Sequence, residues 1–321
     1  MTNLIAKLGF IGDTHLNSKN YGAHRDYAAE SLEYFHKITE KTSELGLTHL
    51  IGTGDFSFSR FISLEYRLEI EKELQEQNRL TNNNRFELKG NHDQAGYGLT
   101  ERDYYVSKGL LKESTNFDIG NVKFTLVDYG KEADTIPNIV DDENHVNIIV
   151  CHNYFKFKDT KLPNFGSAID LDEYTNWFGV DYMVCGHVHK DMEFDGIMVK
   201  DQLQHNVHVN YLGCMMRPAY REGLMDEKGK ILVISVFDDG NIDIDTEYID
   251  LWPLDKSFNI EAKAEEKAKK EEKVSRVDIS DIVKQLDSHD RNVGSPEDII
   301  QGLTNIDDKY KNKAIELLHS V

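Results

Sequence analysis

Five short polar motifs, each directly after an apolar run, constrain the fold of this chain more than any other sequence feature. In chain order they are Asp13-Thr14-His15, Gly54-Asp55, Gly90-Asn91-His92-Asp93, Cys151-His152 and Gly186-His187-Val188-His189. A short apolar run that ends at a turn is typical of a buried strand. The motifs are therefore predicted in loops at strand ends, where α/β proteins place their chemistry.

The segments between the first motifs carry the spacing of helices. Apolar residues recur at helical intervals between Ala28 and Leu45, and residues 64–80 form a second helical stretch. From Val122 onward the apolar runs are strand-like, ending with residues 242–248. Strand–helix alternation followed by strands predicts a partly parallel, layered α/β fold with a second sheet packed on the first.

The residue types in the motifs point to metal binding. Along extended chain alternate side chains share a face, so Asp13 is expected beside His15, and His187 beside His189. Carboxylate oxygens and imidazole nitrogens on converging strand ends suit Mn²⁺, Fe²⁺ or Zn²⁺. Taken singly, an aspartate here is typical of a strand-ending turn, and His152 of a buried core histidine. The tetrapeptides GNHD and GHVH together are a more specific signal.

The ordered set DxH, GD, GNHD, H and GHxH resembles the calcineurin-like metallophosphoesterases over residues 13–189. The resemblance implies a four-layer α-β-β-α sandwich and two divalent cations, Mn²⁺ first, with Fe²⁺ and Zn²⁺ as alternatives. It assigns one cation to Asp13, His15 and His189, a second to Asn91, His152 and His187, and a bridging position to Asp55. It leaves His92 near the scissile phosphate, where an imidazole stabilises the transition state or protonates the leaving group.

Charge and cysteine content limit the other functions of the chain. The 321 residues include 37 Lys plus Arg against 57 Asp plus Glu, a formal net charge of −20, which repels a polyanion at long range. A DNA substrate therefore requires a partner or a local basic patch. The three cysteines, Cys151, Cys185 and Cys214, form no CxxC pair and are expected to be small buried hydrophobes in a reducing compartment.

Composition changes after Pro253 and divides the chain into three parts. Residues 1–252 are expected to form the catalytic domain, with a reduced capping region around 215–250. Residues 253–276, rich in Glu, Lys and Ala, are expected to form a charged helical linker. Residues 277–321 are predicted to form two small amphipathic helices, the second opened by Ser295-Pro296, which grip a partner.

Three features resemble the SbcD-type DNA-repair nucleases, which work with an SbcC-type ABC ATPase bearing a coiled coil. The stretch Tyr211-Leu212-Gly213-Cys214 is similar to a strand of those nucleases and is followed by Arg217 and Arg221. The tail is similar to the segment that holds the ATPase, and the N-terminus carries no export signal. The compact build resembles phage-encoded versions. Two residues depart from the pattern: Phe58 stands where His or Asp is common, and Cys214 replaces Ser.

The segment Tyr154-Phe155-Lys156-Phe157-Lys158 has two interpretations. It interleaves aromatic and cationic residues as single-strand binders do, or it is an ordinary exposed loop, which we favour slightly.

The leading hypothesis is a DNA exo- or endonuclease acting in repair, recombination or replication. The alternatives are a stand-alone phosphatase or nucleotide phosphodiesterase, and a non-catalytic scaffold. The expected partners are DNA, the ATPase and a second copy of the chain, without a membrane; the expected location is the cytoplasm, or the host cytoplasm for a phage protein.

Overall fold

The computed structural model describes residues 2–20, 24–58, 62–94, 99–135, 137, 139–140, 144–157, 168–171, 175–200, 202–216, 228–259, 311–312 and 315. The chain divides into two compact units, Met1–Asn259 and Ile260–Val321. The predicted linker beyond Asn259 lies outside the described residues, and so does the predicted two-helix segment apart from residues 311–312 and 315. All the helices and strands named below belong to the first unit.

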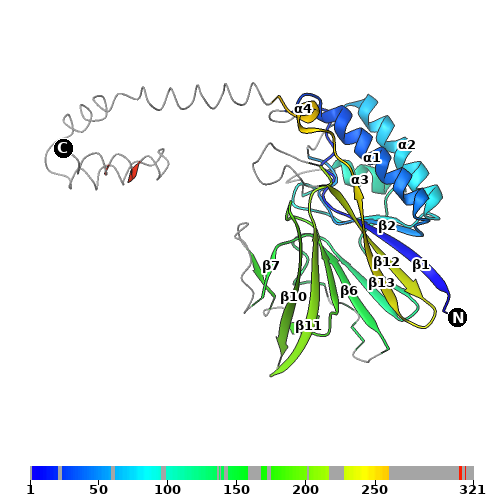
Figure 1. Ribbon diagram of the computed structural model, residues 1–321, viewed down its shortest axis with the longest axis vertical. Coiled ribbons are helices and arrows are strands. Elements are labelled where there is room, and N and C mark those ends of the chain that lie inside the picture. Colours follow the sequence, from blue (N-terminus) through cyan, green and yellow to red (C-terminus); the bar gives the residue numbers. More distant parts are fainter. Residues whose placement is uncertain are drawn as a thin grey trace. The chain divides into compact units, whose positions relative to one another are not determined.

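The first sheet has the strand order β13-β12-β1-β2-β3 (Figure 1). Its strands are β1 (Leu4–Ile11), β2 (His49–Gly52), β3 (Arg85–Glu87), β12 (Gly229–Phe237) and β13 (Ile242–Ile249). The first three strands are parallel, and the helices α1 (Tyr27–Glu44) and α2 (Leu64–Leu80) connect them. A third helix, α3 (Glu101–Ser107), follows β3, and a short helix, α4 (Leu254–Ser257), follows β13.

The second sheet has the strand order β10-β11-β9-β6-β5-β4. Its strands are β4 (Asn116–Ile119), β5 (Val122–Val127), β6 (Val146–Cys151), β9 (Tyr182–Cys185), β10 (Asp191–Lys200) and β11 (Leu203–Leu212). The strands β5, β6, β9 and β11 are parallel, and β10 and β4 run antiparallel at the two edges. The carboxyl ends of the parallel strands therefore meet at one edge of this sheet.

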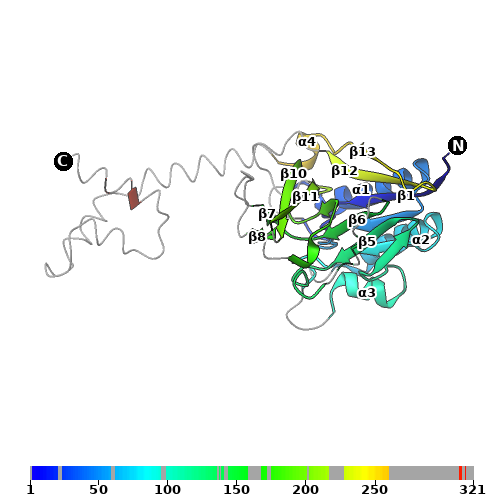
Figure 2. The same ribbon diagram turned by 90° about the horizontal axis from the view of Figure 1, so that it is seen from below.

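Alternating side chains on the strands define the layers. On β12, Ile231 and Val233 pack with α1 and α2, whereas Leu232 and Ile234 pack against the second sheet. Helices thus cover one face of the first sheet, and the two sheets face one another across a second core (Figures 1 and 2). The predicted layered α/β sandwich is confirmed.

The outer face of the second sheet is covered, within the described residues, by β7 (Phe155–Lys156), β8 (Ile169–Asp170) and the 3₁₀ helix Thr175–Trp177. Tyr154, Phe155 and Phe157 are buried in this third core, and Lys156 is exposed. Both interpretations of this segment are wrong for the rings, because rings packed in a core are available neither to stack on bases nor to form an exposed loop. Lys158 lies outside the described residues.

The region expected to form a reduced cap, residues 215–250, belongs largely to the first sheet. β12 pairs with β1 over most of its length, and β13 extends the sheet beyond it. Met215 and Met216 are buried in the helix-side core. Residues 217–227, including Arg217 and Arg221, lie outside the described part of the chain. The apolar pattern of 231–248 is thus that of two strands of the first sheet.

A buried ion pair fixes the loop between β2 and α2. The Glu87 carboxylate accepts a hydrogen bond from Arg85 Nη2 at 2.6 Å and lies 3.3 Å from the backbone N–H of Gly54. Arg102 donates two hydrogen bonds to the Glu87 carbonyl, and all three charged side chains are buried. Because Gly54 directly precedes Asp55, the contact between Glu87 and the Gly54 N–H holds the backbone of the Gly54-Asp55 motif in place.

We expect Glu87→Gln to destabilise the protein by about 3–5 kcal/mol, because it leaves the Arg85 charge buried and uncompensated. Urea unfolding followed by circular dichroism measures the change. The control is Glu76→Gln, which removes an exposed ion pair with Arg79 and is expected to leave the unfolding midpoint unchanged. Equal midpoints for both variants would contradict a structural role for the buried pair.

Candidate metal centre

The polar motifs lie at the carboxyl ends of parallel strands from both sheets. Loops after β1, β2 and β3 of the first sheet supply Asp13, His15, Asp55 and Asn91. Loops after β6 and β9 of the second sheet supply His152, His187 and His189. Each strand is predicted from its own apolar run, but only the packing of the two sheets brings the seven side chains together.

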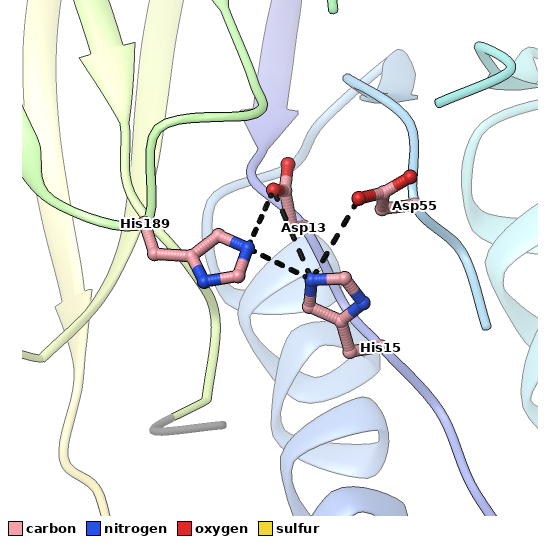
Figure 3. Close-up of side chains that lie close together, drawn as sticks. All are labelled: Asp13, His15, Asp55 and His189. Carbon is pink, nitrogen blue, oxygen red and sulfur yellow. Dashed lines mark hydrogen bonds and ion pairs between the residues drawn. The ribbon is translucent and has the colours of Figure 1, made fainter. Parts of the chain in front are cut away.

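A first cluster consists of Asp13, His15, Asp55 and His189, whose candidate ligand atoms all lie within 4.8 Å of one another (Figure 3). His189 Nε2 is 3.5 Å from Asp13 Oδ2 and 3.0 Å from His15 Nε2. His15 Nε2 is also 3.8 Å from Asp55 Oδ2. Two carboxylates and two imidazoles that converge in this way suit a divalent transition metal.

A second cluster forms around the Asn91 side chain. Asn91 Oδ1 lies 3.0 Å from His152 Nε2 and 2.9 Å from His187 Nδ1. His152 Nε2 is 3.4 Å from Asp55 Oδ2, the same oxygen that faces the first cluster. Asp55 therefore lies between the two clusters, in the position that the sequence resemblance gives to a bridging ligand.

Backbone N–H groups hold one oxygen of each carboxylate and leave the other facing the cluster. Asp13 Oδ1 accepts from the N–H of His187 at 3.2 Å, and Asp55 Oδ1 accepts from the N–H of His92 at 2.8 Å. The free oxygen in each case is Oδ2, the atom closest to the imidazoles. These hydrogen bonds thus orient the carboxylates before any cation binds. Hydrogen bonds to the ligands of a metal site commonly have this role.

The buried polar atoms of the clusters fit a cation. Asp13 Oδ2 is buried and accepts no hydrogen bond from the described residues, which is costly for a carboxylate oxygen unless a cation neutralises it. His152 Nδ1 lies 2.8 Å from the Thr53 carbonyl, which only accepts, so this nitrogen carries the proton. The other nitrogen, Nε2, is then the one available to a metal.

Three of the seven residues adopt the left-handed backbone conformation. The φ angles are 45° at His15, 53° at Asp55 and 76° at His187, a region that residues other than glycine seldom occupy. The motifs are therefore not extended, and the expected sharing of a face is wrong for the GHVH motif. His187 points to the second cluster and His189 to the first. Such backbone strain is common at functional sites.

Glycines in two motifs leave room for the carboxylates. A Cβ atom at Gly90 would lie 2.1 Å from Asp55 Oδ1, and one at Gly186 would lie 2.7 Å from Asp13 Oδ1. Both distances are shorter than a van der Waals contact, so any side chain here would displace a candidate ligand. The glycines of GNHD and GHVH are explained by this close approach.

The two histidines of the first cluster are neutral at pH 7, as a metal requires, whereas His152 of the second cluster is not. Burial lowers the pKa of His15 to about 3 and that of His189 to about 4. Burial also raises the pKa of Asp13 to about 8. Burial opposes protonation of His152, but the carboxylates of Asp13 and Asp55 outweigh it and raise the pKa of His152 to about 9. Without a cation, the Asp13–His152 pair therefore shares a proton at neutral pH.

We expect Mn²⁺ affinity to rise with pH between about 6 and 9, by about tenfold per unit for one proton released. The sign follows because a cation competes with the proton on Asp13 and His152, and raising the pH removes that proton. Titration calorimetry at pH 6, 7 and 8, in buffers with different protonation enthalpies, measures both affinity and proton release. An affinity that does not change with pH would contradict this account.

Two residues of the GNHD motif have separate roles. His92 is exposed, and its ring lies at 5.1 Å from the ring of His15, beside the first cluster. Asp93 is buried, and its Oδ2 accepts hydrogen bonds from the N–H groups of Phe56 and Gly90. Asp93 thus joins two motif loops, a role that sequence reasoning missed although the residue stands inside the motif.

The fold and the two clusters define a metal-dependent phosphoester hydrolase. The family model described as calcineurin-like phosphoesterase matches residues 6–191, more than half of the chain, and the chain belongs to this family. The matched residues include all seven cluster residues and His92. No curated protein matches the chain.

Cys151, Cys185 and Cys214 are buried free thiols. Among the described residues, no helix combines the length and the apolar character that crossing a membrane requires.

Proposed function

We propose that the chain is a two-metal nuclease that hydrolyses phosphodiester bonds in DNA. One cation is held by Asp13, His15 and His189 and the other by Asn91, His152 and His187, with Asp55 between them. Mn²⁺ is the cation we expect, since carboxylate, amide and imidazole ligands all accept it.

The residues of the centre have distinct tasks in hydrolysis. Cations bound at the two clusters would supply Lewis acidity for the phosphoryl oxygens and would lower the pKa of a bound water. Asp55 fixes the spacing of the clusters, because its Oδ2 faces both. His92, exposed beside the first cluster, donates a proton to the leaving oxygen or hydrogen-bonds the phosphate.

The observation that carries the choice of substrate is an aromatic ring beside each cluster. Phe58 stacks on His92, with ring centroids 5.3 Å apart, next to the first cluster. The ring of Tyr129 lies 6.0 Å from that of His187, next to the second cluster. Both aromatic side chains are half-buried. A polynucleotide carries a base on either side of each phosphate, and bases bind proteins by stacking on such rings.

The segment resembling a nuclease strand adds support. Its last residue, Cys214, forms a β-bridge with Asp13. The backbone N–H of the next residue, Met215, donates a hydrogen bond to the Asp13 carbonyl at 3.0 Å. This segment is buried and thus holds the backbone of a ligand of the first cluster in place.

The net charge of −20 makes unaided DNA binding weak, so we assign the grip on DNA to an SbcC-type ABC ATPase bound through residues 277–321. The double substitution Leu303→Asp with Leu317→Asp places charge on the apolar side of the second predicted helix. We expect it to abolish co-purification with the ATPase and to leave hydrolysis of a small phosphodiester unchanged. Retained co-purification would contradict the assignment of this segment.

The proposed function is tested with end-labelled linear duplex and single-stranded DNA, with Mn²⁺ and with EDTA, in the presence and absence of the ATPase and ATP. We expect shortening that requires Mn²⁺, and the label lost first gives the polarity. Turnover of small phosphate esters without DNA cleavage in any arm would overturn the nuclease proposal and favour a stand-alone phosphatase or nucleotide phosphodiesterase.

A further inference from the structure

A set of contacts joins residues 254–258, near the end of the first unit, to the start of α1, and His24, Ser257 and Phe258 at its centre are buried. His24 forms a β-bridge with Phe258, and the N–H of Arg25 donates to the Ser257 carbonyl at 2.8 Å. Arg25 Nε donates to the carbonyls of Asp255 and Phe258. We call residues 254–258, with their contacts to residues 24–30, the anchor.

A charged residue lies at the centre of the anchor. Glu30 is fully buried, and its carboxylate accepts a hydrogen bond from Ser257 Oγ at 2.7 Å. His24 Nδ1 lies 3.4 Å from the other oxygen of Glu30. A buried carboxylate needs such partners to offset its desolvation, so loss of either contact would loosen this end of the chain.

One residue connects the anchor to the first cluster. The ring of Tyr27 packs edge-on against the ring of His24, with centroids 4.7 Å apart. The Tyr27 hydroxyl donates to the carbonyl of His15 at 2.9 Å, and neither residue is exposed. This bond restrains the residue that adopts a left-handed φ of 45° in order to point its ring at the cluster.

We propose that Tyr27 is a positioning residue for the ligand His15, and that the anchor keeps Tyr27 in place. The inference rests on the proposed role of His15 as a metal ligand. Residues bonded to metal ligands commonly change metal affinity by about 10- to 100-fold when they are substituted. The second unit continues the chain from Asn259, directly after the anchor. A pulling force from a partner bound to that unit would therefore act on the anchor first. By displacing the anchor and Tyr27, the force would change the affinity of the site for one cation.

The test uses Tyr27→Phe in the full chain, titrated with Mn²⁺ alone by calorimetry. We expect the affinity of one of two cations to fall about 10- to 100-fold and that of the other to stay unchanged. With Co²⁺ as the probe, the visible absorption of the weakened site is expected to shift, because His15 changes its orientation. Equal affinities and spectra for the variant and the wild type would overturn the positioning role.

Tyr105→Phe is the matched control. Tyr105 is also fully buried, and its hydroxyl also donates to a backbone carbonyl, that of Arg67, at 3.4 Å. The control is expected to bind both cations as the wild type does. If both variants lost the same metal affinity, the loss would follow from removing any buried hydroxyl, and the proposal would be overturned.

Ser257→Ala tests the anchor itself, because it removes the hydrogen bond to Glu30 at a distance from the ligands. We expect the same cation to be weakened, by about tenfold. If Ser257→Ala left both affinities unchanged while Tyr27→Phe lowered one of them, the role of the anchor would be overturned and the role of Tyr27 would stand. Metal binding is measured without DNA, so the two proposals can fail separately. If the variants changed the metal affinities as expected but the wild type did not cleave DNA, the proposed substrate would be wrong and the role of Tyr27 would stand.

Discussion

Asp55→Asn is expected to reduce hydrolysis of phosphodiesters by about 10³-fold or more, because losing about 4 kcal/mol of charge stabilisation corresponds to that factor. Asp55 Oδ2 faces both clusters, so the substitution leaves the first cluster with the Asp13 carboxylate alone and takes the shared carboxylate from the second, whose other members are Asn91, His152 and His187. The amide keeps the size of the side chain, which separates loss of charge from loss of packing. Rates with Mn²⁺ and the stoichiometry of bound Mn²⁺ measure the effect.

The control for this substitution is Asp118→Asn on β4, whose carboxylate forms a surface ion pair with Lys123 on β5. It is expected to keep full activity and both cations. If Asp55→Asn bound two cations with wild-type affinity and retained its rate, Asp55 could not be the residue that joins the two positions.

His92→Asn is expected to slow cleavage of DNA by about 10²- to 10⁴-fold, the range typical of a lost general acid. Mn²⁺ binding should change little, because the His92 ring contacts the cluster only through its edge-on approach to His15. A diester with a p-nitrophenolate leaving group needs little protonation and should be cleaved at nearly the wild-type rate. The two substrates compared on one variant therefore report the proton donation itself.

His36→Asn, at an exposed histidine on α1, is the matched control and should leave both rates unchanged. Equal slowing of both substrates by His92→Asn would exclude His92 as the proton donor and indicate a role in binding the phosphate instead.

The sequence predicts the elements whose apolar residues are regular. The helix interval that begins near Ala28 corresponds to α1, in which Tyr34, Phe35 and Ile38 are buried, and the stretch 64–80 corresponds to α2. β10 gives no such signal, because Asp191, Glu193 and Asp195 lie along an edge strand with little burial. An edge strand is fixed by its pairing with a neighbour, here β11, which a local pattern does not contain.

The candidate site divides in a similar way. Motif order predicts which residues come together, and Asp13 does lie beside His15, but the expected pairing of His187 with His189 fails. Both His15 and His187 have positive φ values that turn the chain. These conformations depend on contacts with distant segments, such as the bond from the Tyr27 hydroxyl to the His15 carbonyl. Tyr27 itself looks in the sequence like one more apolar residue of a helix. Its role becomes apparent only when its neighbour in space is known.

The division of ligands between the two sheets has a consequence for folding. Asp13, His15, Asp55 and Asn91 follow strands of one sheet, and His152, His187 and His189 follow strands of the other. Each bound cation would therefore act as a cross-link between the halves of the sandwich, and loading and folding become one linked equilibrium. At a concentration 100 times Kd, each site would add about 2.7 kcal/mol to stability. A chelator would then act on this protein as a mild denaturant as well as an inhibitor.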